Sequence, residues 1–137
     1  MPHDPSRIAE TRKWFVIVAS DLRCAGLVLG TEPPLLEDAL FHCQQAAEKA
    51  LKGFLTWHKE SFRKVHDLHE LGEQCVGVDA TLEDLLRRAA SLTKYQIMYR
   101  YPGGDPEPTP AEAQSMLALA REVVEAILSR LPDEVRL

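Results

Sequence analysis

Helical periodicity is the feature that most restricts the fold of this chain. Apolar residues recur at three- and four-residue spacing along most of its length, and no stretch alternates in the manner of a β-strand. The pattern predicts a first helix over 5–29 and a second over 34–59. A short third helix opens at His66, a fourth begins at Thr81, and the last begins at Thr109.

Turn and capping residues mark the ends of these helices. Gly30 directly follows the first apolar stripe, which is a common helix stop. Thr81 with Asp84 three residues later resembles a capping box, and the fourth helix is expected to end within 95–101, ahead of a proline. Thr109 suits an N-cap and Pro110 the first helical position, with Glu112 at the third. The sequence therefore predicts an all-α protein, an antiparallel up-and-down bundle of four main helices plus a short fifth helix.

Size and composition indicate one domain and exclude several classes. The 137 residues are enough for one hydrophobic core, so residues 1–137 are expected to form a single domain. The longest apolar runs, such as 14–20, are too short to cross a membrane, and the start of the chain lacks the apolar core of a signal peptide. We therefore expect a cytoplasmic protein, and the three cysteines, which lack paired spacing, are expected to be reduced thiols. A net charge of −5 argues against a protein that coats duplex DNA.

An unusual polar stripe runs along the second predicted helix. At about 100° per residue, His42, Gln45, Lys49 and Lys52 fall within roughly 80° of one another beside several alanines. A surface helix needs only generic glutamates and lysines on its wet face. An imidazole, an amide and two ammonium groups in a row instead indicate the edge of a cleft. Lys52 stands at the margin of the stripe, without a candidate partner, and is expected at the surface.

Asp21 and the 95–101 segment are the other residues that a plain bundle does not explain. Asp21 falls inside the apolar arc of the first helix, where a carboxylate needs a cation or several donors. Lys49 and Arg100 are its expected partners. The acid is then either an ion pair that fixes helix register or the floor of a cleft. Arg100 and Tyr101 precede a proline and could meet a phosphate and a nucleobase.

The sequence contains no strong motif for catalysis or metal binding. His66 and His69 share a helical spacing, but no third ligand lies at a suitable distance in the sequence, so no metal and no cofactor are expected. No Gly-rich phosphate loop and no His-Glu-x-x-His motif occurs.

Several motifs together resemble the HEPN domain family. They are Asp21-Leu in the first helix, FHCQQAAEKALKGFL at 41–55, HDLHEL at 66–71 and YRYP at 99–102, before a final helix. The resemblance implies an antiparallel helical bundle, often a homodimer. It also implies two functions of different classes. Many members are metal-independent ribonucleases, including toxins, and others are binding modules that work beside a minimal nucleotidyltransferase.

The ribonuclease signature of that family is only loosely matched. It consists of an arginine, four to six residues, and a histidine near the start of a late helix. The helix from Thr109 contains no histidine, and the one fit in spacing, Arg63 with His69, lies ahead of the short third helix. Arg63 and His69 are therefore weak candidates for catalysis.

The sequence is best interpreted as a HEPN module without independent activity. It is expected to form a homodimer, to bind a nucleotide or an RNA phosphate, and to pair with a nucleotidyltransferase-type protein in a toxin–antitoxin-like system. The alternatives are a metal-independent ribonuclease toxin and a purely structural dimerisation bundle. The expected phosphate site combines residues of the first helix, the second helix and two later segments: Asp21, His42, Gln45, Lys49, His66, Arg100 and Tyr101.

Overall fold

The structure, a computed structural model, describes residues 3–95 and 107–137. The described residues form five α-helices: α1 (Pro5–Leu29), α2 (Leu36–Trp57), α3 (Leu68–Val78), α4 (Glu83–Ala89) and α5 (Pro110–Leu128). Three single-turn to double-turn 3₁₀ segments accompany them: η1 (Ala80–Leu82), η2 (Ala90–Tyr95) and η3 (Asp133–Val135). No strand occurs among the described residues, and the predicted all-α bundle is confirmed.

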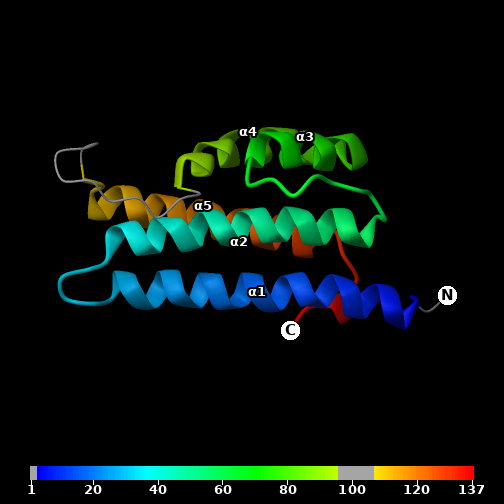
Figure 1. Cartoon of the computed structure of the whole chain (residues 1–137), viewed down its shortest axis with the longest axis horizontal. Coiled ribbons are helices and arrows are strands. Elements are labelled where there is room, and N and C mark those ends of the chain that lie inside the picture. Colours follow the sequence, from blue (N-terminus) through cyan, green and yellow to red (C-terminus); the bar gives the residue numbers. More distant parts are fainter. Residues whose placement is uncertain (1–2, 96–106) are drawn as a thin grey trace.

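Helix α2 is the central element of the bundle. It lies antiparallel to α1 along its whole length and packs against α5 on another side (Figure 1). Helices α3 and α4 pack against each other, and α3 also contacts α2. One continuous hydrophobic cluster draws side chains from all five helices, so α2 is enclosed on most of its surface. Its buried side includes Ala39, Cys43, Ala46, Ala47, Ala50, Leu51, Phe54 and Leu55.

Several predicted helix ends agree with the structure. Helix α1 spans the residues expected, and the Asp4 carboxylate caps it by accepting the Ser6 N–H at 3.0 Å. Helix α5 begins as predicted, with Thr109 Oγ1 accepting the Glu112 N–H at 3.0 Å and Pro110 in the first turn. The Glu112 carboxylate does not complete a capping box, because it accepts the Tyr95 hydroxyl at 2.7 Å.

The fourth helix differs from the prediction. The expected capping box of Thr81 and Asp84 is wrong, because the Thr81 hydroxyl donates to the Asp79 carboxylate at 2.6 Å. Arg130, two residues beyond the end of α5, fixes that carboxylate, with Nε 2.9 Å from Asp79 Oδ2. The α-helix itself ends at Ala89, and the chain continues in 3₁₀ geometry to Tyr95.

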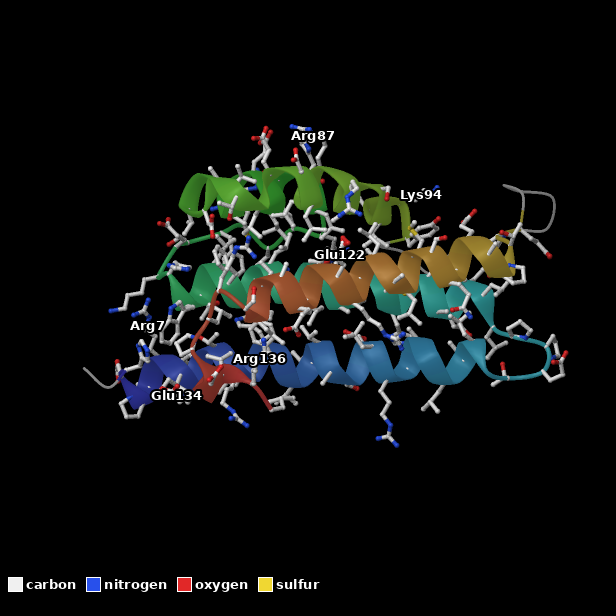
Figure 2. All side chains as sticks on the ribbon, turned by 180° about the vertical axis from the view of Figure 1, so that it is seen from behind. Arg7, Arg87, Lys94, Glu122, Glu134 and Arg136 are labelled. Atoms are coloured by element: carbon white, nitrogen blue, oxygen red, sulfur yellow. The ribbon has the colours of Figure 1, made fainter. Side chains whose placement is uncertain are left out.

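The C-terminal segment returns to α1 and packs against it. Figure 2 shows Glu134 and Arg136 beside the first helix. Arg12 Nη1 donates to the carbonyl oxygens of Glu134 and Arg136, both at 3.0 Å, and Val135 between them is buried. No described helix has the length and apolar character needed to cross a membrane.

Gly53 sets the close approach of α1 and α2. A Cβ atom added at this position would lie 2.7 Å from Phe15 Cε2 and 3.1 Å from Trp14 Cβ. Real Cβ atoms do not approach other carbons that closely, so any larger residue would push the two helices apart or displace the buried Phe15 ring. Gly77 of α3 offers a contrast, since a Cβ there would meet nothing within 4 Å.

We predict opposite effects for alanine at these two glycines. Gly53→Ala should lower the free energy of unfolding by about 1–3 kcal/mol, because overpacking outweighs the gain in helix propensity. Gly77→Ala should raise it by up to about 1 kcal/mol, because only the helix propensity changes. Urea denaturation of both variants measures the difference. Equal stabilisation by the two substitutions would contradict this account of the α1–α2 contact.

Candidate functional site

A fully buried glutamate lies at the centre of the polar side of α2. Glu48 has no exposed surface, yet its carboxylate has four hydrogen-bond partners. Its Oε1 accepts from Gln44 Nε2 at 3.1 Å and from His66 Nδ1 at 2.8 Å. Its Oε2 accepts from Lys52 Nζ at 3.1 Å and also from Lys49 Nζ. Every partner is a donor, so the site is built for an ionised carboxylate.

The same contacts set the protonation state of Glu48. Burial by itself would raise the pKa of this carboxyl, because it disfavours the charged form. The hydrogen bonds from Lys49, Gln44 and His66, together with the charge of Lys49, outweigh that effect and lower the pKa of Glu48 to about 2. The ionised carboxylate can only accept, so His66 Nδ1 carries a proton.

Local sequence explains how these donors converge. Gln44, Glu48 and Lys52 follow one another at four-residue spacing, which places them on one face of α2. His66 arrives from the irregular segment between α2 and α3, where Gln44 Nε2 also donates to the His66 carbonyl at 3.2 Å. Gln45 completes the group by donating to Gln44 Oε1 at 2.6 Å. We call Gln44, Gln45, Glu48, Lys49, Lys52 and His66 the Glu48 cluster.

A second carboxylate–histidine pair joins α1 to α2 beside this cluster. Asp21 Oδ1 and His42 Nδ1 lie 2.8 Å apart, and both side chains are largely buried. Burial raises the pKa of Asp21, although the hydrogen bond and charge of His42 and the charge of Lys49 oppose it. Lys49 thus acts on both carboxylates, because it bonds Glu48 directly and its charge reaches Asp21.

The structure brings together five of the residues expected at the site. Gln45, Lys49 and His66 belong to the Glu48 cluster, whereas Asp21 and His42 form a separate pair that the charge of Lys49 reaches. Asp21 was predicted to pair with Lys49 and Arg100, whereas its hydrogen-bonded partner is His42. The other two residues expected at the site, Arg100 and Tyr101, lie outside the described residues.

The prediction for one residue of the polar stripe was wrong, and two further residues of the Glu48 cluster were not predicted. Lys52 was expected at the surface, but it is 7% exposed and bonded to Glu48. Gln44 and Glu48 were not singled out, although both have no exposed surface. The available signal was a glutamate followed by lysines one and four positions later, within a helix whose neighbouring positions are alanines. The sequence pattern of α2 does not show that this side is buried, because the segment that contains His66 covers it in the fold.

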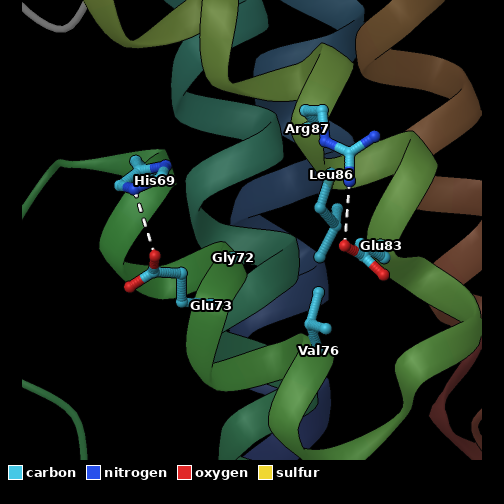
Figure 3. Close-up of a pocket in the computed structure, with 7 residues that line it drawn as sticks. All are labelled: His69, Gly72, Glu73, Val76, Glu83, Leu86 and Arg87. Atoms are coloured by element: carbon cyan, nitrogen blue, oxygen red, sulfur yellow. Dashed lines mark hydrogen bonds and ion pairs between the residues drawn. The ribbon is translucent and has the colours of Figure 1, made fainter.

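Arg63 and His69, the weak catalytic candidates, are bound to separate surface carboxylates. Arg63 Nε lies 3.4 Å from Glu70 Oε1, and His69 Nε2 lies 3.1 Å from Glu73 Oε1. His69 also lines a pocket of about 300 Å³ between α3 and α4, which Arg63 does not line (Figure 3). Its other lining residues include the Arg87–Glu83 ion pair at the rim and the side chains of Val76 and Leu86.

The described residues offer neither a set of metal ligands nor a reactive thiol at the site. Within residues 3–95 and 107–137, no group of three His, Cys, Asp or Glu side chains is placed to hold a metal ion. Cys43 and Cys75 are buried, and burial raises the pKa of each thiol to about 12. Neither thiol is therefore ionised near neutral pH, which a cysteine nucleophile would require.

The arrangement can neutralise an anion and transfer protons. In the Glu48 cluster one carboxylate faces two ammonium groups, so the cluster carries a net charge of +1 with His66 neutral. His66 is the most open member, with 59% of its side chain exposed, whereas Lys49 is 17% exposed. A phosphate would reach the positive charge of Lys49 and the ring of His66 from solvent.

We predict that Glu48→Gln lowers the free energy of unfolding by about 3 kcal/mol at pH 7, because it leaves two nearly buried lysines without their counter-charge. The folded-state pKa of Glu48 lies below the unfolded value of 4.5, so its stabilisation is present above about pH 4.5 and declines as the pH falls toward 2. The gap between wild type and variant should therefore narrow from pH 5 to pH 3 in urea denaturation. The exposed Glu73→Gln is the control and should change stability by less than about 0.5 kcal/mol. A gap that stays constant with pH would contradict the assignment.

Comparison with known proteins identifies the family of this bundle. The sequence profile of the HEPN domain matches residues 12–131, which include the Asp21–His42 pair and the whole Glu48 cluster. No curated protein and no solved structure matches the chain. The match covers most of the chain and agrees with the all-helical architecture, and the protein therefore belongs to the HEPN domain family.

Proposed function

We propose that this HEPN module binds the phosphate of a nucleotide or of RNA at the Glu48 cluster. The observation that carries the proposal is the net positive charge held around a buried, ionised glutamate. Glu48 orients the two ammonium groups and the imidazole in advance, so a phosphate would meet donors whose conformational freedom is already restricted. Burying these charges costs desolvation free energy, and the binding of an anionic ligand would give that arrangement a function.

The division of roles within the site follows from exposure. Lys49 and His66 have the access to solvent that a ligand needs, so they are proposed to contact the phosphate. Lys52 is almost completely buried and bonds Glu48, so it is proposed to support the site electrostatically. The Asp21–His42 pair is proposed to border the phosphate site, because the charge of Lys49 also acts on Asp21.

Phosphate binding predicts a loss of affinity when the more accessible of the two ammonium groups, that of Lys49, is removed. Lys49→Gln should weaken the binding of AMP, ATP or a short single-stranded RNA by about tenfold or more, because a charge-assisted hydrogen bond contributes about 1.5–3 kcal/mol. Isothermal titration calorimetry measures the dissociation constant of each probe for the wild type and the variant. Arg87→Gln on α4 removes an equal charge at an exposed ion pair and should leave affinity within about twofold. Absence of binding by the wild-type protein to all three probes would end the proposal.

We propose further that the protein forms a homodimer through the outer face of α1. Large apolar side chains are exposed on this helix, with Val16 at 55%, Ile17 at 43% and Leu27 at 61%. A helix that is apolar on its outer as well as its inner side usually has a partner on both. Pairing two copies along α1 would bury these side chains.

Pairing with a nucleotidyltransferase-type protein, in a toxin–antitoxin-like system, is the third part of the proposal. It is supported by the membership of the HEPN family together with the phosphate site proposed here. A bundle that only dimerises is the competing interpretation, and it requires that neither a nucleotide nor such a partner binds.

Dimerisation predicts a specific effect of a charge on α1. Leu27→Asp should convert the dimer to a monomer without loss of helical content, because the side chain is exposed within one copy. Ser115→Asp places the same charge on an exposed position of α5 and should leave the dimer intact. Light scattering after size-exclusion chromatography gives the mass of each variant, and of a mixture with a nucleotidyltransferase-type protein. A wild-type monomer at micromolar concentration would exclude the homodimer, and an unchanged mass in the mixture would exclude that partner.

A further inference from the structure

The pocket between α3 and α4 has a lining that suits a ligand of a different kind. It is an open pocket of about 300 Å³, and its apolar lining consists of Gly72, Val76 and Leu86. Figure 3 shows the Val76 and Leu86 side chains pointing toward each other, with charged side chains on both sides of them. We call this pocket the α3–α4 groove, and its lining residues are His69, Gly72, Glu73, Val76, Glu83, Leu86 and Arg87.

Two ion pairs border the α3–α4 groove, one from each helix. His69 Nε2 lies 3.1 Å from Glu73 Oε1 on α3, and Arg87 Nη2 lies 2.8 Å from Glu83 Oε1 on α4. All four side chains are at least 60% exposed, so each pair contributes little to stability and can exchange its partner for another charge. Arg87 Nη1 also lies 3.5 Å from Asp84 Oδ1, which gives the guanidinium a second acceptor when Glu83 binds another cation.

The helices that form the groove carry most of the negative charge of the chain. Residues 67–88 contain six acidic residues and two arginines, a net charge of −4, whereas the whole chain carries −5. Bases from outside this stretch pair with two of its acids, Arg63 with Glu70 and Arg130 with Asp79. The stretch remains negative after these two bases are counted, so it attracts positively charged partners.

The size and chemistry of the groove fit a protein segment better than a small molecule. Its volume is at the lower end of the range of pockets that enclose drug-sized ligands. One apolar side chain would cover Val76 and Leu86, while the carboxylates of Glu73 and Glu83 stand on opposite sides of the groove (Figure 3). An amphipathic helix presents this combination, because its apolar residues lie on one face and basic residues can flank them.

We propose that the α3–α4 groove binds a basic amphipathic segment of another protein. A leucine-sized side chain inserts between Val76 and Leu86, and lysine or arginine residues beside it pair with Glu73 and Glu83. Burial of the apolar side chain supplies affinity, and the charges select the sequence that binds. No residue of the groove belongs to the Glu48 cluster, so this inference goes beyond the phosphate binding proposed above and does not depend on it.

Peptide binding to the full chain tests this assignment. The probes are three pools of labelled amphipathic peptides, about 14 residues long, the length at which an isolated helix is marginally stable. The pools combine leucine with lysine, leucine with glutamate, or alanine with lysine, and fluorescence anisotropy measures the dissociation constant of each. The wild type should bind the leucine–lysine pool at least about tenfold more tightly than either other pool, since only this pool supplies both the apolar side chain and the positive charge.

Charge reversal locates the bound peptide. A double variant with Glu73→Lys and Glu83→Lys should bind the leucine–lysine pool about tenfold more weakly or worse and prefer the leucine–glutamate pool, because each substitution replaces an attraction by a repulsion. The matched control combines Glu10→Lys with Glu134→Lys, which changes the net charge equally at exposed residues outside the groove, and it should bind as the wild type does. Raising the salt from about 0.05 M to about 0.5 M should weaken binding to the wild type several-fold, because salt screens exposed charges.

Four results would overturn the proposal. They are no binding of the leucine–lysine pool, equal binding of the alanine–lysine pool, unchanged binding in the groove double variant, and a wild-type oligomer that only the groove double variant dissociates. The second would mean attraction by charge without the apolar lining, the third a different surface, and the fourth a second copy of this chain as the occupant. The comparison of pools and the salt titration use the wild type alone, so they remain decisive whatever the stability of the variants.

Discussion

The polar half of this bundle depends on one ion, the carboxylate of Glu48. An isolated ionised carboxylate in a protein interior costs several kcal/mol, so its donors cannot be removed without a large loss of stability. Two of them come from one and four positions ahead on α2, and a third comes from the segment that leads to α3. Glu48 therefore fixes not only side chains but also the path of the chain after α2, since that path must bring His66 back to it.

On the opposite side of α2, the small size of the side chains determines the packing. Alanines, together with Gly53, let α1 approach closely along the helix. Both requirements are met within a single helix of 22 residues. This explains why α2 holds so many buried residues, and why the polar region lies at the edge of a tightly packed interface rather than on a freely solvated face.

Sequence predicted the features that local chemistry determines. The extent of α1 follows from its apolar periodicity, and the start of α5 follows from a threonine and a proline whose effects act within one helical turn. The stripe that includes His42, Gln45 and Lys49 follows from helical spacing alone. The start of α4 could not be predicted in this way, because the side chain that competes for Thr81 is held by Arg130, 51 residues after Asp79. The burial of Glu48 and Lys52 likewise depends on a segment whose path no local pattern specifies.

The bonds between Arg12 and the C-terminal segment have a consequence for the dynamics of the chain. Chain ends usually open and close independently of the rest of a domain, and their amide protons exchange quickly. In this protein one guanidinium near the start of α1 holds the carbonyl oxygens of residues 134 and 136, with Val135 buried between them. Local unfolding of α1 as far as Arg12 would break the hydrogen bonds to residues 134 and 136, and detachment of that segment would leave the Arg12 guanidinium without these two acceptors. The two ends thus form one cooperative unit of local unfolding, although they lie 122 or more residues apart in the sequence.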